Sequence, residues 1–172
     1  MAAEGEEDGA YNPNAQKQKR KEAFLSAVLS GDSDRTAQLL EGAGAGAPLD
    51  LVHTVVDECG ASALLLAALG GDVATARVLL GAGADPAVAD KDGTTALLAA
   101  CLTGCVEMYH LLTPDVSALG AGMLLNQVDK DGHSPLQVAC KEGHVVIVSD
   151  ILTRHGQHVN VNRSDIFGDT PL

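Results

Sequence analysis

The stretch DKDGTTAL, residues 90–97, decides the fold of this chain because close variants of it recur along the sequence. The other copies are DECGASAL at 57–64, DKDGHSPL at 129–136 and DIFGDTPL at 165–172. Their glycines, Gly60, Gly93, Gly132 and Gly168, lie 33, 39 and 36 residues apart. A motif that recurs at such intervals indicates stacked supersecondary units that are not stable alone.

Each part of the motif predicts a piece of local structure. Asp accepts hydrogen bonds from the backbone amides that follow it, and Gly supplies the positive φ of a tight turn. Ser or Thr then caps a helix, with Pro allowed at its first position. We therefore expect a first helix at about 63–69, 96–102 and 135–142 in successive units.

Apolar residues at helical spacing predict a second helix in each unit. It is expected to end at Gly81, at Pro114 and near Gly156. Helices this short are below the roughly 12 to 15 residues at which an isolated helix becomes marginal in water. Stacking must therefore stabilise them.

The chain resembles the ankyrin repeat family over about residues 20–172. The resemblance rests on the turn, the Ser/Thr-Pro-Leu step, the Ala67-Ala68 pair and the Gly83-Ala84-Asp85 exit. It implies an all-α fold, an ankyrin-repeat solenoid of stacked helix-turn-helix units joined by β-turn or hairpin loops. The histidine that usually follows the motif's Leu is replaced by Leu65, Leu98 and Gln137. We expect the hydrogen bond by which that histidine ties neighbouring turns to be absent.

The motif also predicts the domain boundaries. Phe24, Ala27, Val28 and Leu40 repeat the apolar pattern of the later units without the turn motif, which is typical of a capping repeat. The expected units are a disordered acidic N-terminal tail at 1–16, a divergent capping repeat with a Gly-rich exit loop at 17–56, an ankyrin repeat at 57–89, a repeat with an inserted loop at 90–128, a repeat at 129–164 and the start of an incomplete repeat at 165–172. Because the last unit breaks off, we expect these residues to be part of a longer chain.

Charge and hydropathy narrow the class of partner. The net charge of −12 argues against nucleic acid, since phosphate binding depends on clustered Lys and Arg. One basic run, Lys17 to Lys21, is interpreted as a solvated helix face, with a nuclear-import signal or a contact to an acidic partner as alternatives. The longest apolar stretch is shorter than the 18 or so residues of a membrane span, and the acidic N-terminus does not resemble a secretory signal. We expect a cytoplasmic protein without membrane insertion.

The cysteines are interpreted as structural. Cys101 and Cys140 occupy equivalent positions in successive repeats and behave as small core residues in this interpretation. Packed helices lie too far apart for a disulfide at such positions. A metal site of Cys101, Cys105 and His110 stays open as an outside alternative.

The remaining chemistry-bearing residues show no catalytic pattern. No Ser or Cys nucleophile has a recognisable elbow or dyad context. His144 is interpreted as structural, and His155 and His158 as a solvated loop rather than a metal pair. The glycine-rich stretches 42–46 and 81–83 follow helices, not strands, which excludes a nucleotide loop. We expect no catalytic residue, no metal and no cofactor.

Because the sequence shows no pattern for catalysis, metal binding or nucleotide binding, we expect a binding surface for a protein partner. The resemblance implies that partners contact the turn tips and the exposed side of the first helices, which together line a concave groove. Carried onto this chain, the candidate partner-binding residues are Glu58, Lys91, Asp92, Thr94, Leu102, Thr103, Lys130, Asp131, His133, Lys141, Glu142, Ile166 and Phe167.

Two irregular apolar segments, 42–56 and 113–127, compete with this groove. Either they pack against the array or they dock a partner. Asn126 and Asn162 each precede the next repeat's Asp by three residues and are interpreted as structural.

Two functional hypotheses follow. The first is a non-catalytic interaction module that scaffolds or tethers a protein partner. The second is a regulatory or targeting segment of a larger multidomain protein, such as an enzyme, a channel or a ubiquitin-ligase adaptor. A metal protein or enzyme in its own right is the outside alternative.

Overall fold

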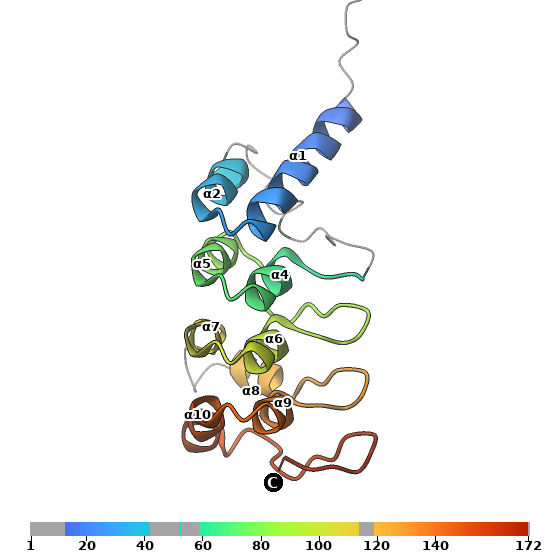
Figure 1. Cartoon of the computed structure of the whole chain (residues 1–172), viewed down its shortest axis with the longest axis vertical. Helices are drawn as coiled ribbons and strands as arrows, with labels where there is room; N and C mark the ends of the chain where they lie inside the picture. Colours follow the sequence, from blue (N-terminus) through green and yellow to red (C-terminus); the bar gives the residue numbers. More distant parts are fainter. Residues whose placement is uncertain (1–12, 42–51, 53–58, 114–118, 172) are drawn as a thin grey trace, which may run out of the picture.

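The structure is a computed structural model that describes residues 13–41, 52, 59–113 and 119–171. Over these residues the chain is a stack of antiparallel helix pairs (Figure 1). The helices are α1 (Pro13–Leu29), α2 (Ser33–Glu41), α4 (Ala63–Leu69), α5 (Val73–Gly81), α6 (Ala96–Thr103), α7 (Val106–Leu112), α8 (Leu119–Asn126), α9 (Pro135–Lys141) and α10 (Val145–His155). The expected all-α stack of helix pairs is confirmed.

The helices form two columns. In one column α1, α4, α6 and α9 pack in succession, and in the other α2, α5, α7 and α10 do so. The hairpin turns that precede the first helices project to one side of the stack, away from the second column (Figure 1). The array therefore has two sides. We call the side with these turns the finger side, and the side formed by the second column of helices the outer-helix side.

The first helices begin at side-chain caps, as the motif predicts. Ser62, Thr95 and Ser134 accept hydrogen bonds from backbone amides three residues on, at 3.2, 3.3 and 3.3 Å. Each of these caps has an extended backbone, and Pro135 occupies the first helical position of α9. A cap of this kind contributes about 1 kcal/mol, because it satisfies an amide that has no partner within the helix.

Small side chains form the core between the columns. Ala67, Ala68, Ala100 and Ala139 are buried almost completely, and so is Cys101. Side chains of this size allow the helices of one unit to approach those of the next closely. Leu64, Leu97 and Leu136, the larger side chains that end three copies of the motif, are also buried and belong to the same core.

The inserted segment of the third unit contains a helix that the sequence did not predict. Residues 119–126 form α8, although the sequence there, LGAGMLLN, carries two glycines. Leu124 and Leu125 are buried against the stack, whereas Met123 is 72% exposed. Burial of two leucines, worth about 1.5–3 kcal/mol each, outweighs the weak helix propensity. For these residues self-packing is confirmed; of segment 42–56 only Val52 is described, and it is buried.

Two other expectations were wrong in detail. α1 begins at Pro13, so residues 13–16 are helical rather than part of a disordered tail; proline is well suited to the first helical position. His155 is 1% exposed and lies on α10, not in a solvated loop. It follows Ile151 by four residues and continues the buried stripe of that helix.

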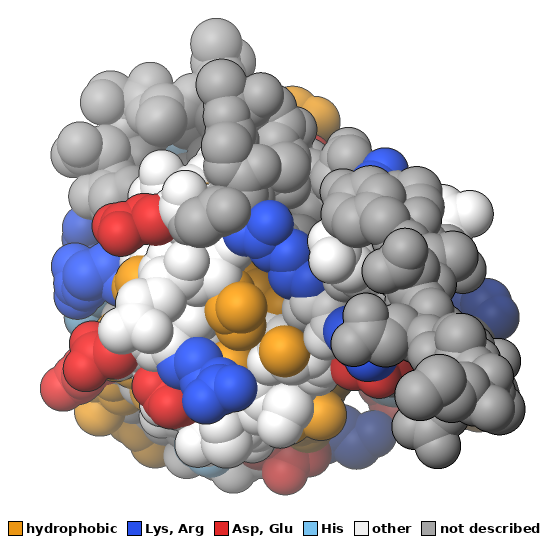
Figure 2. Space-filling model, turned by 90° about the horizontal axis from the view of Figure 1, so that it is seen from above, with side chains coloured by type: hydrophobic (Ala, Val, Ile, Leu, Met, Phe, Trp, Pro, Cys, Tyr) orange, Lys and Arg blue, Asp and Glu red, His pale blue; other side chains and the backbone are white. Residues whose placement is uncertain are grey.

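The basic run lies at the N-terminal end of the stack. Figure 2 looks onto this end, where Lys and Arg side chains border a small apolar area. Lys17 and Lys19 are exposed on α1, but the Arg20 guanidinium donates to the carbonyl of Leu39 and joins α1 to α2. No helix in the described part of the chain is both long and apolar enough to cross a membrane.

Candidate functional site

Three turns on one side of the stack are each built around one aspartate. We call residues 90–94, 129–133 and 165–169 the fingers. The Oδ1 atom of Asp90 accepts hydrogen bonds from the amides of Asp92 and Thr94, at 2.9 and 2.8 Å. Asp129 and Asp165 repeat this arrangement. The glycine of each finger has a positive φ between 79° and 88°, which other residues rarely adopt.

Backbone hydrogen bonds hold neighbouring fingers in register. The amides of Lys91, Lys130 and Ile166 donate to the carbonyls of Cys59, Asp92 and Asp131 in the preceding unit, at 3.0, 2.8 and 3.0 Å. The tips are therefore arranged as a ladder whose spacing is set by the helix stack. Such a row presents side chains at fixed intervals rather than as independent loops.

An ion pair joins two finger tips. Lys130 Nζ lies 2.5 Å from Asp92 Oδ1, and this hydrogen bond raises the pKa of the lysine. Both side chains are about 60% exposed, so the pair contributes little to stability. The charges remain accessible to a partner.

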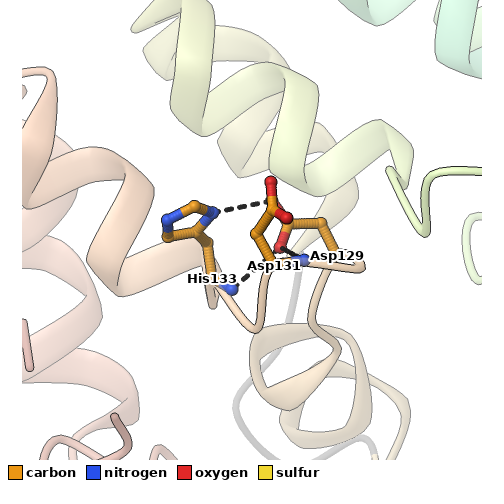
Figure 3. A group of neighbouring side chains, drawn as sticks. All are labelled: Asp129, Asp131 and His133. Carbon is orange, nitrogen blue, oxygen red and sulfur yellow. Dashed lines mark hydrogen bonds and ion pairs between the residues drawn. The ribbon is translucent and has the colours of Figure 1, made fainter. Parts of the chain in front are cut away.

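His133 is a link between fingers rather than an exposed contact. Its Nδ1 lies 3.0 Å from Asp129 Oδ2, and its Nε2 lies 3.5 Å from Asp165 Oδ2 in the next finger. The imidazole is 15% exposed and the Asp165 side chain only 5%. Figure 3 shows the ring turned toward the carboxylates of its own finger.

The finger geometry accounts for the one potential metal-ligand cluster among the described residues. Ligand atoms of Asp129, Asp131 and His133 lie within 4.8 Å of one another (Figure 3). Asp129 already accepts two amides and faces the imidazole, which is the turn structure itself. The alternative set of Cys101, Cys105 and His110 is not brought together, although all three residues are described.

Burial makes Cys101, a member of that set, a poor metal ligand. It raises the pKa of the Cys101 thiol to about 12, which disfavours the thiolate that metals bind. All four cysteines of the chain are free. Cys101 is buried, Cys105 and Cys140 are partly buried, and Cys59 is exposed.

Gln137 supplies a tie between turns that we expected to be absent. Its Nε2 donates to the carbonyl of Asp169 in the next finger at 2.8 Å, and its Oε1 accepts the amide of Ser134 at 3.0 Å. The long amide side chain bridges the two units in the place of the family's histidine. The expectation holds for Leu65 and Leu98, which carry no hydrogen-bonding group, and is wrong for Gln137.

Other links in the last two units are structural, as expected. His144 Nε2 lies 3.1 Å from the carbonyl oxygen of Leu102, which ties α10 to the preceding unit. The Asn126 amide group donates to the carbonyl of His158 at 2.6 Å and accepts the amide of Asn160 at 3.0 Å. These bonds fix α8 against the exit of the fourth unit.

The described residues line two cavities that open on the finger side. The first, which we call the inter-helix cavity, lies between α6 and α9 and has a volume of about 160 Å³; it is lined by Thr94, Leu98, Leu102, Asp129, His133, Val138, Lys141 and Glu142. The second, the terminal cavity, lies between α9 and the last finger and has a volume of about 550 Å³; it is lined by His133, Gln137, Cys140, Lys141, Asp165, Gly168, Asp169, Thr170 and Pro171. His133 and Lys141 belong to both walls.

Most of the residues that the sequence singled out are accessible. Those classed as exposed are Lys91, Asp92, Leu102, Thr103, Lys130, Lys141, Glu142, Ile166 and Phe167. Thr94, Asp131 and His133 are half-buried, and Glu58 lies outside the described residues.

Five of the candidates, Thr94, Leu102, His133, Lys141 and Glu142, converge on the inter-helix cavity. Sequence reasoning missed three of its other wall residues, Leu98, Asp129 and Val138. Val138 precedes Lys141 by three residues and could have been found from helical spacing.

Comparison with known proteins agrees with this architecture. The family described as ankyrin repeats (3 copies) matches residues 24–122, and the family described as ankyrin repeat matches residues 131–166. The chain therefore belongs to the ankyrin repeat family. No significant match to a curated protein was found. Ankyrin repeats are generally protein–protein interaction modules, and the matched families include no catalytic domain.

Proposed function

We propose that this chain is a non-catalytic protein-binding module that holds its partner on the finger side of the array. The observation that carries the proposal is the inter-helix cavity, on which residues of two fingers and two helices converge. Leu102 is 47% exposed at its wall, an apolar side chain that association with a partner could cover.

The last finger adds to this surface. Ile166 and Phe167 are 64% and 73% exposed where the preceding fingers carry Lys and Asp. Of those preceding residues, Lys91, Asp92 and Lys130 are exposed even though another unit follows them, and Asp131 is half-buried. An exposed aromatic side chain at such a place is a typical anchor for a protein partner.

Three further statements stay predictions. A regulatory or targeting role within a larger protein would use the same surface. The cytoplasmic location is untested, and so is nuclear import through Lys17 to Lys21. None of the three changes which residues we expect the partner to contact.

A matched pair of double variants tests the proposal. Leu102→Ala with Lys141→Ala removes one apolar and one basic side chain from the cavity wall. Val146→Ala with Arg77→Ala removes the same kinds of side chain from exposed positions on the outer helices α10 and α5. Because exposed substitutions usually change stability by less than about 0.5 kcal/mol, both variants should unfold near the parent's temperature.

The readout is quantitative affinity capture from cells, with the unchanged chain as reference. Proteins captured by the reference and by the outer-helix variant, but lost from the cavity variant, are partners of the finger side. An identical set of captured proteins for all three forms would contradict the proposal.

A further inference from the structure

A small polar cluster lies on the outer-helix side, where α7 packs against α10. Arg154 Nη1 lies 3.2 Å from His110 Nδ1 and donates to Asp150 Oδ2 at 3.1 Å. Because a guanidinium group only donates, the Nδ1 atom of His110 is the acceptor in the first contact. The imidazole of His110 is therefore neutral in this arrangement.

Protonation of His110 would break the arrangement. An imidazolium carries an N–H on both ring nitrogens and cannot accept a hydrogen bond from Arg154. The Asp150 Oδ2 atom lies 3.9 Å from His110 Nδ1, but it already accepts from Arg154, so two cations would compete for one carboxylate. The His110 side chain is 45% exposed, which limits the effect of this pair through solvent screening.

His155 adds a buried imidazole to the same helix. Its side chain is 1% exposed, and its Nε2 atom has no hydrogen-bond partner among the described residues. Burial lowers the pKa of His155, and so does the positive charge of Arg154, against a smaller opposite effect of Asp150. A proton on this ring would place an unpaired positive charge inside the stack, which is costly.

The other ionisable groups near this contact do not offset the added charge. Burial raises the pKa of Tyr109 on α7, and it raises the pKa of Cys101 on α6 to about 12, so both side chains stay neutral in mild acid. His158 is exposed beyond α10, and its charge also lowers the pKa of His155. Since histidine ordinarily changes charge between about pH 5 and 8, mild acidification adds only positive charge here.

We propose that the contact between α7 and α10 is an acid-sensitive joint. It is closed while His110 and His155 are neutral, and it loosens when these rings take up protons. The fourth unit then opens locally while the units before it stay closed. Because the inter-helix cavity lies between α6 and α9 of the same two units, opening would also release a partner held there. That consequence rests on the proposed function, whereas the joint itself does not.

Hydrogen exchange of the whole 172-residue chain, measured by mass spectrometry at about pH 7.5 and about pH 5.5, tests the joint. After correction for the intrinsic exchange rates, the protection of the α10 amides should fall about fivefold at the lower pH, which corresponds to about 1 kcal/mol. Helix α4 is the reference within the same molecule, because no histidine lies between residues 59 and 109. Its protection should not change.

Two variants assign the effect to the two histidines. His110→Gln keeps an acceptor for Arg154 at every pH and changes a half-exposed side chain, so it should fold as the parent does. His155→Gln removes the buried group that titrates. Each should reduce the fivefold loss to less than about twofold, whereas the exposed control His158→Gln should retain it.

Three results would overturn the joint. The first is an α10 that loses no protection at the lower pH. The second is an α4 that loses as much protection as α10, which would indicate global destabilisation. The third is a full fivefold loss in either His110→Gln or His155→Gln.

Discussion

Replacement of Gln137 by Ala should destabilise the last finger selectively. The Gln137 side chain is 6% exposed and makes two hydrogen bonds, to the Ser134 amide and to the Asp169 carbonyl. Each contributes about 0.5–1.5 kcal/mol, and the substitution leaves both backbone groups without this partner. We expect the free energy of unfolding to fall by about 2 kcal/mol. At about 2–4 °C per kcal/mol for a chain of this size, the melting temperature should fall by about 4–8 °C.

Urea unfolding followed by circular dichroism measures the loss, and hydrogen exchange locates it. Because each repeat contacts only its neighbours, the amides of residues 165–170 should exchange faster while those of α4 keep their protection. Gln157→Ala is the matched control, since Gln157 is exposed beyond α10. A Gln137→Ala protein within 0.5 kcal/mol of the parent, with unchanged exchange in the finger, would refute the role assigned to this side chain.

Three other substitutions or treatments probe the packing. Gly104→Ala should cost about 1 kcal/mol more than Gly143→Ala in urea unfolding. Both glycines have positive φ, but a Cβ at Gly104 overlaps the His144 ring, which would have to leave the Leu102 carbonyl, whereas Gly143 has open space. Equal costs would contradict this. Ellman's reagent followed by peptide mapping should label Cys59 in the folded protein and Cys101 only after unfolding. The Cys101 thiol is buried, and burial raises its pKa to about 12. Labelling of Cys101 in the folded protein would contradict its place in the core. Burial lowers the pKa of His155 below its ordinary 6.5, so the unfolded chain binds the proton at a higher pH than the folded chain does. The contribution of this residue to stability is therefore lost as pH falls below about 6.5. The urea midpoint of His155→Gln should drop less between pH 7 and pH 5 than that of the parent, and an equal drop would contradict the burial of this side chain.

The fold was predictable because the motif encodes its own local structure. The boundaries expected for α4 agree with the structure residue for residue, since Ser62 and Gly70 mark its two ends. Capping and turn formation depend on neighbours within four residues, which is the range that a sequence pattern shows directly.

The features that could not be predicted from the sequence depend on contacts between units. α8 forms in spite of its glycines because Leu124 and Leu125 find a surface to pack on. Gln137 reaches a carbonyl 32 residues away, a partner that appears only after the fingers stack. His155 could have been found from its spacing of four after Ile151, because the sequence already predicted that this helix extends to about Gly156.

The candidate site was predictable in outline. Tip and helix positions followed from the repeat pattern, and five of them meet at one cavity. The cavity itself was not predictable, because its shape depends on how Leu98 and Val138 lie across adjacent units. The inward turn of His133 was missed for the same reason, since its second carboxylate comes from the next finger.

Crosslinking of lysines with mass spectrometry on the native protein in cells tests the central claim most directly. The lysines of the chain form two groups, one on α1 and one on the finger side: Lys17, Lys19 and Lys21 in the first, Lys91, Lys130 and Lys141 in the second. If the partner binds the fingers and first helices, intermolecular crosslinks should concentrate on Lys91, Lys130 and Lys141. Crosslinks to a partner confined to Lys17, Lys19 and Lys21 would contradict the account and place the binding surface at the N-terminal end of the stack.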